Sequence, residues 1–200
     1  MLIHGLINGS RVNGPGLRAV IYFQGCTLGC PSCWNPETHS FIGREREVAE
    51  IVDSVAAAHG EHALEGVTFS GGEPMQQSAA LLALIESLHD RLPGLSFGMY
   101  SGYSERELSS GRYWCRSEQT QLHKQDIWRR IRSRLDFAVL GRYVAGQPSA
   151  LSLRTSMNQK LTLFSECYRE TDFEPQEVEI HIDMQGSVQV TGFPIVGIPA

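Results

Sequence analysis

Residues 24–35 read QGCTLGCPSCWN and place Cys26, Cys30 and Cys33 in one short loop. Thiolates spaced this closely are metal ligands, and their number is informative. A structural zinc site closes with four ligands, and a [4Fe–4S] cluster is usually held by four cysteines. Three cysteines leave one iron of such a cluster without a protein thiolate. The segment therefore predicts an iron–sulfur site with one position open to a small molecule.

The regions around this loop indicate an α/β fold. The run AVIYFQ at 19–24 predicts a buried strand that leads into the loop, where Gly29 and Pro31 prevent a regular helix. Ser104 and Glu107 form a capping-box pattern that predicts a short helix. Further strands are predicted at 66–70, 95–100 and 136–140, and helices at 44–59, 77–92 and 119–135. This alternation is typical of parallel βα units, in a barrel or an open sheet.

The chain changes character after residue 145. Residues 147–159 are polar, and apolar side chains then alternate at Val178, Ile180 and Ile182 and again at Val188 and Val190. Period-two alternation on either side of a turn predicts a β-hairpin. We expect this hairpin within a C-terminal extension, residues 165–200, packed on a core domain of residues 1–164.

Composition excludes several classes of protein. With 200 residues, 42% of them hydrophobic, the chain suits one globular domain with a substantial core. A net charge of −5 argues against nucleic acid as a partner. The N-terminus lacks a signal-peptide pattern, and no apolar run approaches the roughly 20 residues that span a bilayer. We expect a soluble, cytoplasmic protein that has no membrane partner.

Three unusual segments follow predicted strands. They are the cysteine loop, the turn Gly71-Gly72-Glu73-Pro74 and the segment Tyr100-Ser101-Gly102-Tyr103. Ligands of parallel sheets collect at the carboxyl ends of the strands, so we expect these segments to form one site. The open iron needs a bidentate nitrogen and oxygen donor, which the amine and carboxylate of an amino acid supply. The two glycines allow close backbone approach, and Glu73 adds an anionic acceptor for the amine.

With these motifs, the chain resembles the radical S-adenosylmethionine (SAM) superfamily, whose cluster loop has this spacing and whose second strand often ends in GGEP. Within it, the chain is most similar to the glycyl-radical-enzyme activating proteins, and among these to the activators of anaerobic ribonucleoside-triphosphate reductase. The supporting segments are VNGPGLR (12–18), CPSCWN (30–35), TFSGGEP (68–74), SGY (101–103), GRY (141–143) and RTSMNQ (154–159).

The resemblance implies a fold and an activity. The fold is an incomplete (β/α) barrel of the radical SAM type, with 1–164 as its core domain. A reduced [4Fe–4S] cluster cleaves SAM to a 5′-deoxyadenosyl radical, which generates a glycyl radical on a partner enzyme. The partner is expected to be an anaerobic ribonucleotide reductase, and the electron donor a low-potential protein such as flavodoxin or ferredoxin. The chemistry belongs to the cofactors, so no side chain is expected to be catalytic.

The resemblance also assigns residues. Cys26, Cys30 and Cys33 are the cluster ligands. The loop at 13–18 is a candidate lip for the incoming glycine segment. One cation should neutralise the methionine carboxylate. The SAM-binding residues are Ser32, Cys33 and Trp34, on the adenine side, and Gly71, Gly72 and Glu73, which hold the methionine amine.

The sequence is compatible with several alternatives. The same radical chemistry could act on a small molecule or a peptide, because a C-terminal hairpin could shape a different pocket. A zinc-binding interaction module, with His39 as fourth ligand, is the alternative from another class. Among single residues, Trp34 could be core packing, and Arg18 and Arg142 are more typical of surface or salt-bridge residues than of ligands.

Overall fold

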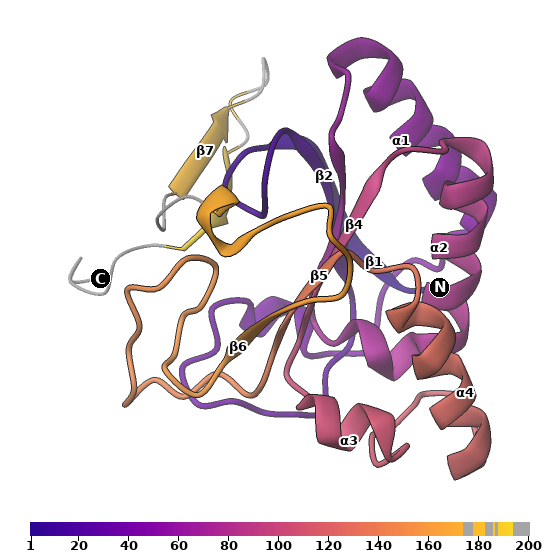
Figure 1. Ribbon diagram of the computed structural model, residues 1–200, viewed down its shortest axis with the longest axis vertical. Helices are drawn as coiled ribbons and strands as arrows, with labels where there is room; N and C mark the ends of the chain where they lie inside the picture. The colour runs from indigo at the N-terminus through magenta and orange to yellow at the C-terminus, as the bar shows by residue number, and fades with distance from the viewer. Residues whose placement is uncertain (174–177, 183–185, 187, 194–200) are drawn as a thin grey trace.

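The computed structural model describes residues 1–173, 178–182, 186 and 188–193. Its main sheet has six strands in the order β1-β2-β3-β4-β5-β6 (Figure 1). The strands β2 to β5 are parallel, and the edge strands β1 and β6 are antiparallel to their neighbours. Their bounds are β1 Ile3–Ser10, β2 Arg18–Phe23, β3 Gly66–Gly71, β4 Ser96–Ser101, β5 Phe137–Leu140 and β6 Lys160–Leu163. The prediction of an α/β fold with a mostly parallel sheet is confirmed.

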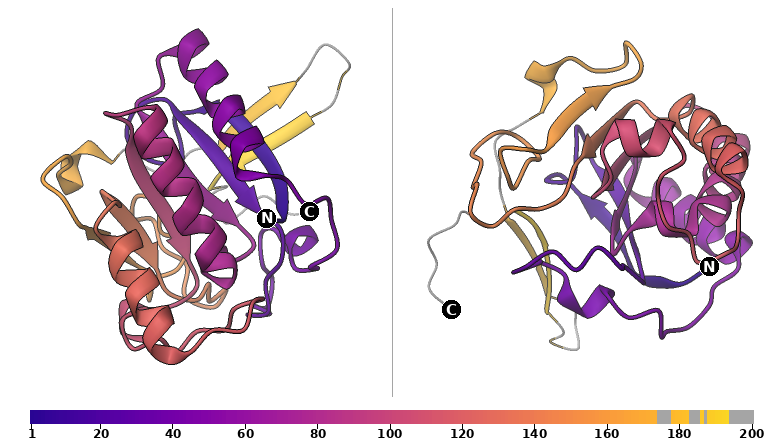
Figure 2. Two further views of the ribbon diagram at one scale, coloured as in Figure 1. Left: turned by 90° about the vertical axis from the view of Figure 1, so that its right-hand side faces the viewer. Right: turned by 90° about the horizontal axis from the view of Figure 1, so that it is seen from below.

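The helices lie mainly on one face of this sheet. They are α1 Val48–His62, α2 Ser78–Arg91, α3 Glu105–Ser109 and α4 Gln121–Arg132. Figure 2 (left) shows α1, α2 and α4 side by side over the sheet. The predicted capping box is present at the start of α3, where Ser104 and Glu107 each bind the other's backbone N–H. None of the helices in the described ranges is long and apolar enough to cross a membrane.

Side-chain alternation along the strands gives the sheet two different faces. On the helix side, Phe23, Phe69 and Met99 belong to the main hydrophobic core. On the other side, Tyr22 pairs in register with Ser70, and Tyr100 with Val139. A smaller apolar cluster covers part of this second face and consists of Phe137, Val139, Leu153, Tyr168, Phe173 and Phe193. The second face therefore has both a packed region and a row of polar side chains.

The predicted hairpin is present as β7 Val178–Ile182 and β8 Val188–Gly192, a separate two-stranded sheet. It is joined to the core by hydrogen bonds on its inner side. The Arg11 N–H donates to Glu179 Oε1 over 2.9 Å, and Asn13 Nδ2 donates to Thr191 Oγ1 over 2.8 Å. The hairpin therefore sits over the sheet face opposite the helices, next to the loop that precedes β2.

Two strands were not predicted. β1 has the sequence IHGLINGS, whose glycines and polar residues hide its strand character, and β6 is the short segment KLTL. Both are antiparallel edge strands that depend on pairing with β2 and β5. Such pairing is a long-range interaction, which a local pattern does not report.

Candidate functional site

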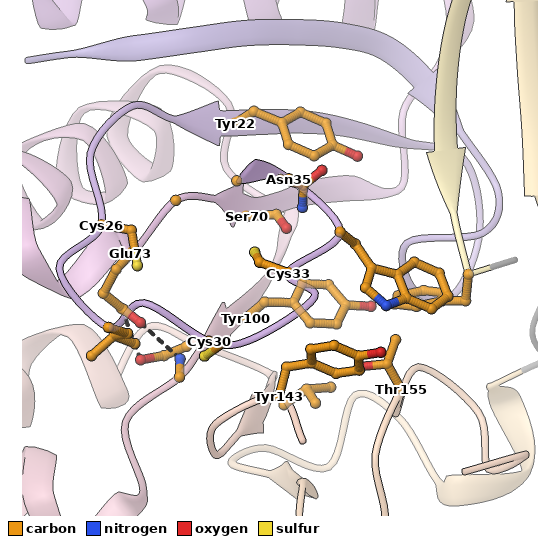
Figure 3. Close-up of a pocket in the computed structure, with 18 of the residues that line it drawn as sticks. Tyr22, Cys26, Cys30, Cys33, Asn35, Ser70, Glu73, Tyr100, Tyr143 and Thr155 are labelled. Carbon is orange, nitrogen blue, oxygen red and sulfur yellow. Dashed lines mark hydrogen bonds between the residues drawn. The ribbon is translucent and has the colours of Figure 1, made fainter. Parts of the chain in front are cut away.

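A cavity of ≈ 400 Å³ lies at the carboxyl ends of the parallel strands (Figure 3). Each of four strands leads into its wall. The cysteine loop follows β2. Gly71 ends β3, and Gly72 and Glu73 follow it. Ser101 ends β4 and Gly102 follows it, and Gly141 follows β5. The predicted meeting of the three unusual segments at one edge of the sheet is therefore what the structure shows.

All three loop cysteines line this cavity. Cys26, Cys30 and Cys33 are free thiols and only partly buried. Burial raises the pKa of Cys26 to about 11, against a weaker lowering by a backbone hydrogen bond, and burial also raises the pKa of Cys33. Both thiols are therefore protonated at neutral pH without metal. A metal that binds them must displace these protons.

The start of the cysteine loop is held by a buried side chain that the sequence reasoning missed. Thr27 N–H donates to Gln76 Oε1 over 2.9 Å, and Gln76 Nε2 donates to Thr27 Oγ1 over 2.7 Å. The same Nε2 donates to the Tyr103 hydroxyl over 2.9 Å. Gln76 is fully buried, and so is the neighbouring Met75. Gln77 and Ser78 follow Gln76 directly and are also polar, so the local sequence holds no signal that singles Gln76 out.

The two glycines after β3 are required by packing. A Cβ on Gly71 would lie 2.6 Å from Phe23 N, and Gly71 has φ +96. A Cβ on Gly72 would lie 2.5 Å from Gly25 O. Backbone bonds join the same turns, because Gly72 N–H donates to Phe23 O over 2.8 Å and Glu73 N–H to Gly25 O over 3.0 Å. The glycines thus let the turn lie directly against the start of the cysteine loop.

Glu73 lines the cavity but is fully buried. Its carboxylate accepts hydrogen bonds from Met75 N–H at 3.0 Å, Ser101 Oγ at 2.8 Å and Gly102 N–H at 2.7 Å. Burial nevertheless raises its pKa to about 7, because these donors offset only part of the cost of desolvating the charge. The side chain therefore ties the end of β3 to the end of β4 in addition to facing the site.

The remaining predicted SAM-binding residues differ in placement. Trp34 lines the cavity and meets Tyr143 edge-on, with ring centroids 6.1 Å apart. It also packs against the smaller apolar cluster, as the core-packing alternative expects, and its stacking on adenine stays a prediction. Ser32 is exposed, has φ +57 and does not line the cavity. Its part in binding stays a prediction.

Arg18 is not a surface residue. It is fully buried on the sheet and surrounded by neutral acceptors. Its Nε donates to Thr68 Oγ1 over 2.8 Å, and its Nη1 to Ser96 Oγ over 2.8 Å. Desolvation by burial lowers its pKa. Its role is to hold the loop at 13–18 to β3 and β4, since Nη1 also donates to the Pro15 carbonyl over 3.1 Å.

The expected cation for the methionine carboxylate is not found in this cavity. Among the described residues that line it there is no lysine or arginine, and the charged ones are Glu37 and Glu73. Arg142 instead makes an ion pair with Glu107 at 3.1 Å and lies over the Tyr103 ring. His39, the alternative zinc ligand, is also outside the described lining, and its carbonyl accepts from Cys26 N–H.

Comparison with known proteins places these residues in a family context. The family profile described as "4Fe-4S single cluster domain" matches residues 12–162. The anaerobic ribonucleoside-triphosphate reductase-activating protein of Salmonella typhimurium is 31% identical over 103 residues, which are 50% of this chain and 67% of that protein. The pyruvate formate-lyase-activating enzyme of Clostridium pasteurianum is 32% identical over 111 residues, covering 52% of this chain and 46% of that protein.

A solved structure, QueE from Escherichia coli, matches 52% of each chain at a TM-score of 0.36 and 21% identity. The residues matched by the family profile include the three loop cysteines, the glycine turn and Glu73. They exclude the hairpin formed by β7 and β8.

Proposed function

The chain belongs to the family of 4Fe-4S single cluster domains, and on that premise we propose that it is a radical SAM activase for a glycyl radical enzyme. The match confirms the resemblance recognised in the sequence, and it establishes an enzyme of the activating type with a [4Fe–4S] cluster and SAM as cofactors. The observation that carries the proposal is the meeting of three thiols and the glycine turn around one cavity.

The residues present fit a cluster with one open corner. Three thiols face the cavity, whereas the other two cysteines are elsewhere: Cys115 is buried beside Ser78, 3.3 Å away, and Cys167 is exposed. The donor set is therefore three sulfurs. When bound, a reduced [4Fe–4S] cluster supplies the electron that cleaves SAM into methionine and a 5′-deoxyadenosyl radical, which then takes hydrogen from a glycine of the partner.

The chain's own residues bind and orient in this proposal. Cys26, Cys30 and Cys33 would hold the cluster, and the backbone at Gly71 and Gly72 with the Glu73 carboxylate would receive the methionine amine. Glu73 has accepted three hydrogen bonds, and a carboxylate can accept about four, so one site is left for the ligand. Cys33 and Trp34, which line the cavity, would face the adenine, and the part of Ser32, which lies outside the described lining, stays a prediction from the sequence. The aromatic wall of Trp34 and Tyr143 helps to exclude water.

The finer points of architecture and context are part of the same proposal. We propose that the sheet is an incomplete (β/α) barrel, with residues 1–164 as its core domain and 165–200 as an extension. Three long helices on one face and the cavity on the other support this arrangement. We further propose a cytoplasmic protein, an anaerobic ribonucleoside-triphosphate reductase as partner, and flavodoxin or ferredoxin as electron donor.

The test uses anaerobic protein reconstituted with iron and sulfide, a reductant, SAM and the candidate reductase. We expect a glycyl radical signal in electron paramagnetic resonance and formation of 5′-deoxyadenosine. Cys30→Ser should abolish both, and Cys115→Ser, which alters a thiol outside the cavity, should retain both. A wild-type protein that holds the cluster yet gives no glycyl signal with any reductase offered would contradict the proposal.

A second candidate is radical SAM chemistry on a small molecule or a free peptide. The observation that favours it is the hairpin, because four consecutive residues from Val190 to Phe193 line the cavity. Formation of 5′-deoxyadenosine that depends on a metabolite and needs no protein partner would establish this candidate.

A further inference from the structure

The end of the cavity away from Glu73 is built differently from the cysteine end. Tyr22 and Tyr100 project from the sheet there (Figure 3). Thr191 in β8 and Phe193, the residue after β8, complete this end of the lining. The hairpin lies outside the residues that the family profile matches. Tyr22 and Tyr100 therefore lie within the matched segment and Thr191 and Phe193 outside it, and the proposed function assigns no role to any of the four.

One part of the wall is a closed hydrogen-bond network. The Tyr22 hydroxyl lies 2.5 Å from Thr191 Oγ1, which also accepts from Asn13 Nδ2 over 2.8 Å. Asn13 Nδ2 donates in addition to Ser10 Oγ over 2.9 Å. These groups fasten β8 to the sheet and to the loop at 13–18. The hairpin is thus a fixed part of the cavity wall.

The Tyr100 hydroxyl is the exception in this wall. It is buried and has no hydrogen-bond partner within the part of the chain that the structure describes. Phe193 packs on its ring with centroids 5.7 Å apart. Burial raises the Tyr100 pKa well above its usual range, so the hydroxyl stays protonated. A buried donor without an acceptor is costly, and a ligand that supplies an acceptor removes that cost.

The charge of the cavity wall limits which kind of ligand can supply an acceptor to the Tyr100 hydroxyl. Tyr22, Tyr100, Asn13 and Thr191 offer hydroxyl and amide groups, and the described lining carries no lysine or arginine. Beside Tyr100 a phosphate or carboxylate would therefore lose hydration without gaining a counter-charge from the residues of this wall. A peptide backbone is uncharged and offers carbonyl acceptors.

The outer face of the hairpin indicates that the peptide belongs to a protein. Apolar side chains alternate along both strands on this face, and their exposed fractions range from 38% for Val178 to 69% for Ile182. Ile180 pairs in register with Val190, which also lines the cavity. Exposed apolar surface of this kind is typical of interaction sites. It is continuous with the cavity, so a protein that inserts a segment would cover both.

We propose that the subsite between Tyr100 and β8 binds the glycine-bearing segment of the protein substrate, with the Tyr100 hydroxyl donating to a backbone carbonyl and the outer face of the hairpin contacting the rest of that protein. This inference rests on the proposed function. It makes Tyr100 a substrate-binding residue and the hairpin the element that selects the partner.

The test measures binding by fluorescence anisotropy, with reconstituted full-length protein and SAM. The probe is a labelled peptide with the radical-bearing glycine of an anaerobic ribonucleoside-triphosphate reductase. Loss of one hydrogen bond, at roughly 1 kcal/mol, predicts that Tyr100→Phe raises the Kd about 5-fold. Tyr113→Phe is the matched control, because the Tyr113 hydroxyl donates to Lys124 O away from the cavity. It should leave the Kd unchanged.

A second variant tests the outer face. Ile180→Ser should leave the Kd of the short peptide unchanged and raise the Kd of the whole reductase several-fold. Because Ile180 is exposed, this variant keeps the core intact. Peptide binding that Tyr100→Phe does not weaken, or a metabolite that competes with the peptide for this subsite as the true substrate, overturns the inference.

Failure of the inference can be told apart from failure of the proposed function. The same wild-type preparation is assayed for 5′-deoxyadenosine and the glycyl signal. If the wild type gives a glycyl signal and binds the peptide as tightly as Tyr100→Phe does, the proposed subsite is wrong and the proposed activase function still holds. If a cluster-loaded protein yields neither 5′-deoxyadenosine nor a glycyl signal, the proposed activase function itself is wrong.

Discussion

Single buried polar residues shape this site as much as the cysteines do. Glu73 and Arg18 are both fully buried, yet neither has an ion-pair partner within the described chain. Each is instead surrounded by hydrogen-bonding groups that are formally neutral. Such groups hold a charge in place but do not cancel its desolvation cost, which is why burial dominates both pKa shifts.

Glu73 predicts a pH-dependent stability for the metal-free protein. Its pKa is about 7 in the fold and 4.5 in the reference state. Between pH 4.5 and 7, Glu73 is deprotonated in the unfolded chain and protonated in the folded chain. The free energy of unfolding therefore falls as pH rises through this range, by about 3 kcal/mol in all. Glu73→Gln removes this dependence. Its stability relative to wild type should therefore rise from pH 4.5 to 7 in urea unfolding, and parallel pH curves would contradict the prediction.

Arg18 predicts a large cost on truncation. Arg18→Ala leaves buried acceptors on Thr68 and Ser96 without donors and opens a cavity under the Phe137 ring. We expect a loss of about 3 kcal/mol in the free energy of unfolding. Arg44→Ala is the control, because 81% of that side chain is exposed, and it should change stability by less than about 0.5 kcal/mol. Equal effects of the two substitutions would refute the role given to Arg18.

At the scale of elements, the cysteine loop is positioned by its neighbours. Within the loop, the Cys33 N–H donates a hydrogen bond to the Cys30 carbonyl, three residues earlier, over 3.2 Å. Gln76 binds Thr27, and the glycine turn after β3 lies against Gly25. The cluster site therefore depends on contact between the ends of β2 and β3, two adjacent parallel strands.

Gly72→Ala tests this dependence. The new Cβ would lie 2.5 Å from Gly25 O, so one of the two turns must move. We expect a destabilisation of about 1 to 3 kcal/mol and a reduced iron and sulfide content after reconstitution. Gly5→Ala is the control, because a Cβ there meets nothing within 4 Å. If Gly72→Ala binds iron as well as Gly5→Ala does, the turn does not position the loop.

At the scale of the whole molecule, the main core lies between the helices and one face of the sheet, and the candidate cluster site lies at the carboxyl ends of the strands. The helices and the inner strand residues bury each other without any contribution from the loop cysteines. The fold therefore does not depend on metal, unlike small domains that fold only around zinc.

This separation predicts the result of metal removal. Chelation of iron should bleach the brown protein but leave its far-UV circular dichroism unchanged, with a melting temperature lowered by only a few degrees. Protease cleavage should increase within the cysteine loop. Cooperative unfolding on chelation, or a colourless protein that contains one zinc, would instead support the zinc-binding module.

The sequence by itself determined the three-thiol loop, the glycine turn, the four parallel strands and the hairpin. These are local features, because ligand spacing, turn chemistry and side-chain period all act between residues close in the chain. It did not predict β1 and β6, the burial of Arg18 or the hydrogen bonds between Gln76 and Thr27. Only the tertiary structure decided that Ser32 lies outside the cavity and that Tyr100 and Thr191 form one wall. Tyr22 and Thr191, for example, are 169 residues apart. Contacts between residues so far apart in the sequence form when packing brings separate elements together. No periodic pattern in the sequence predicts them.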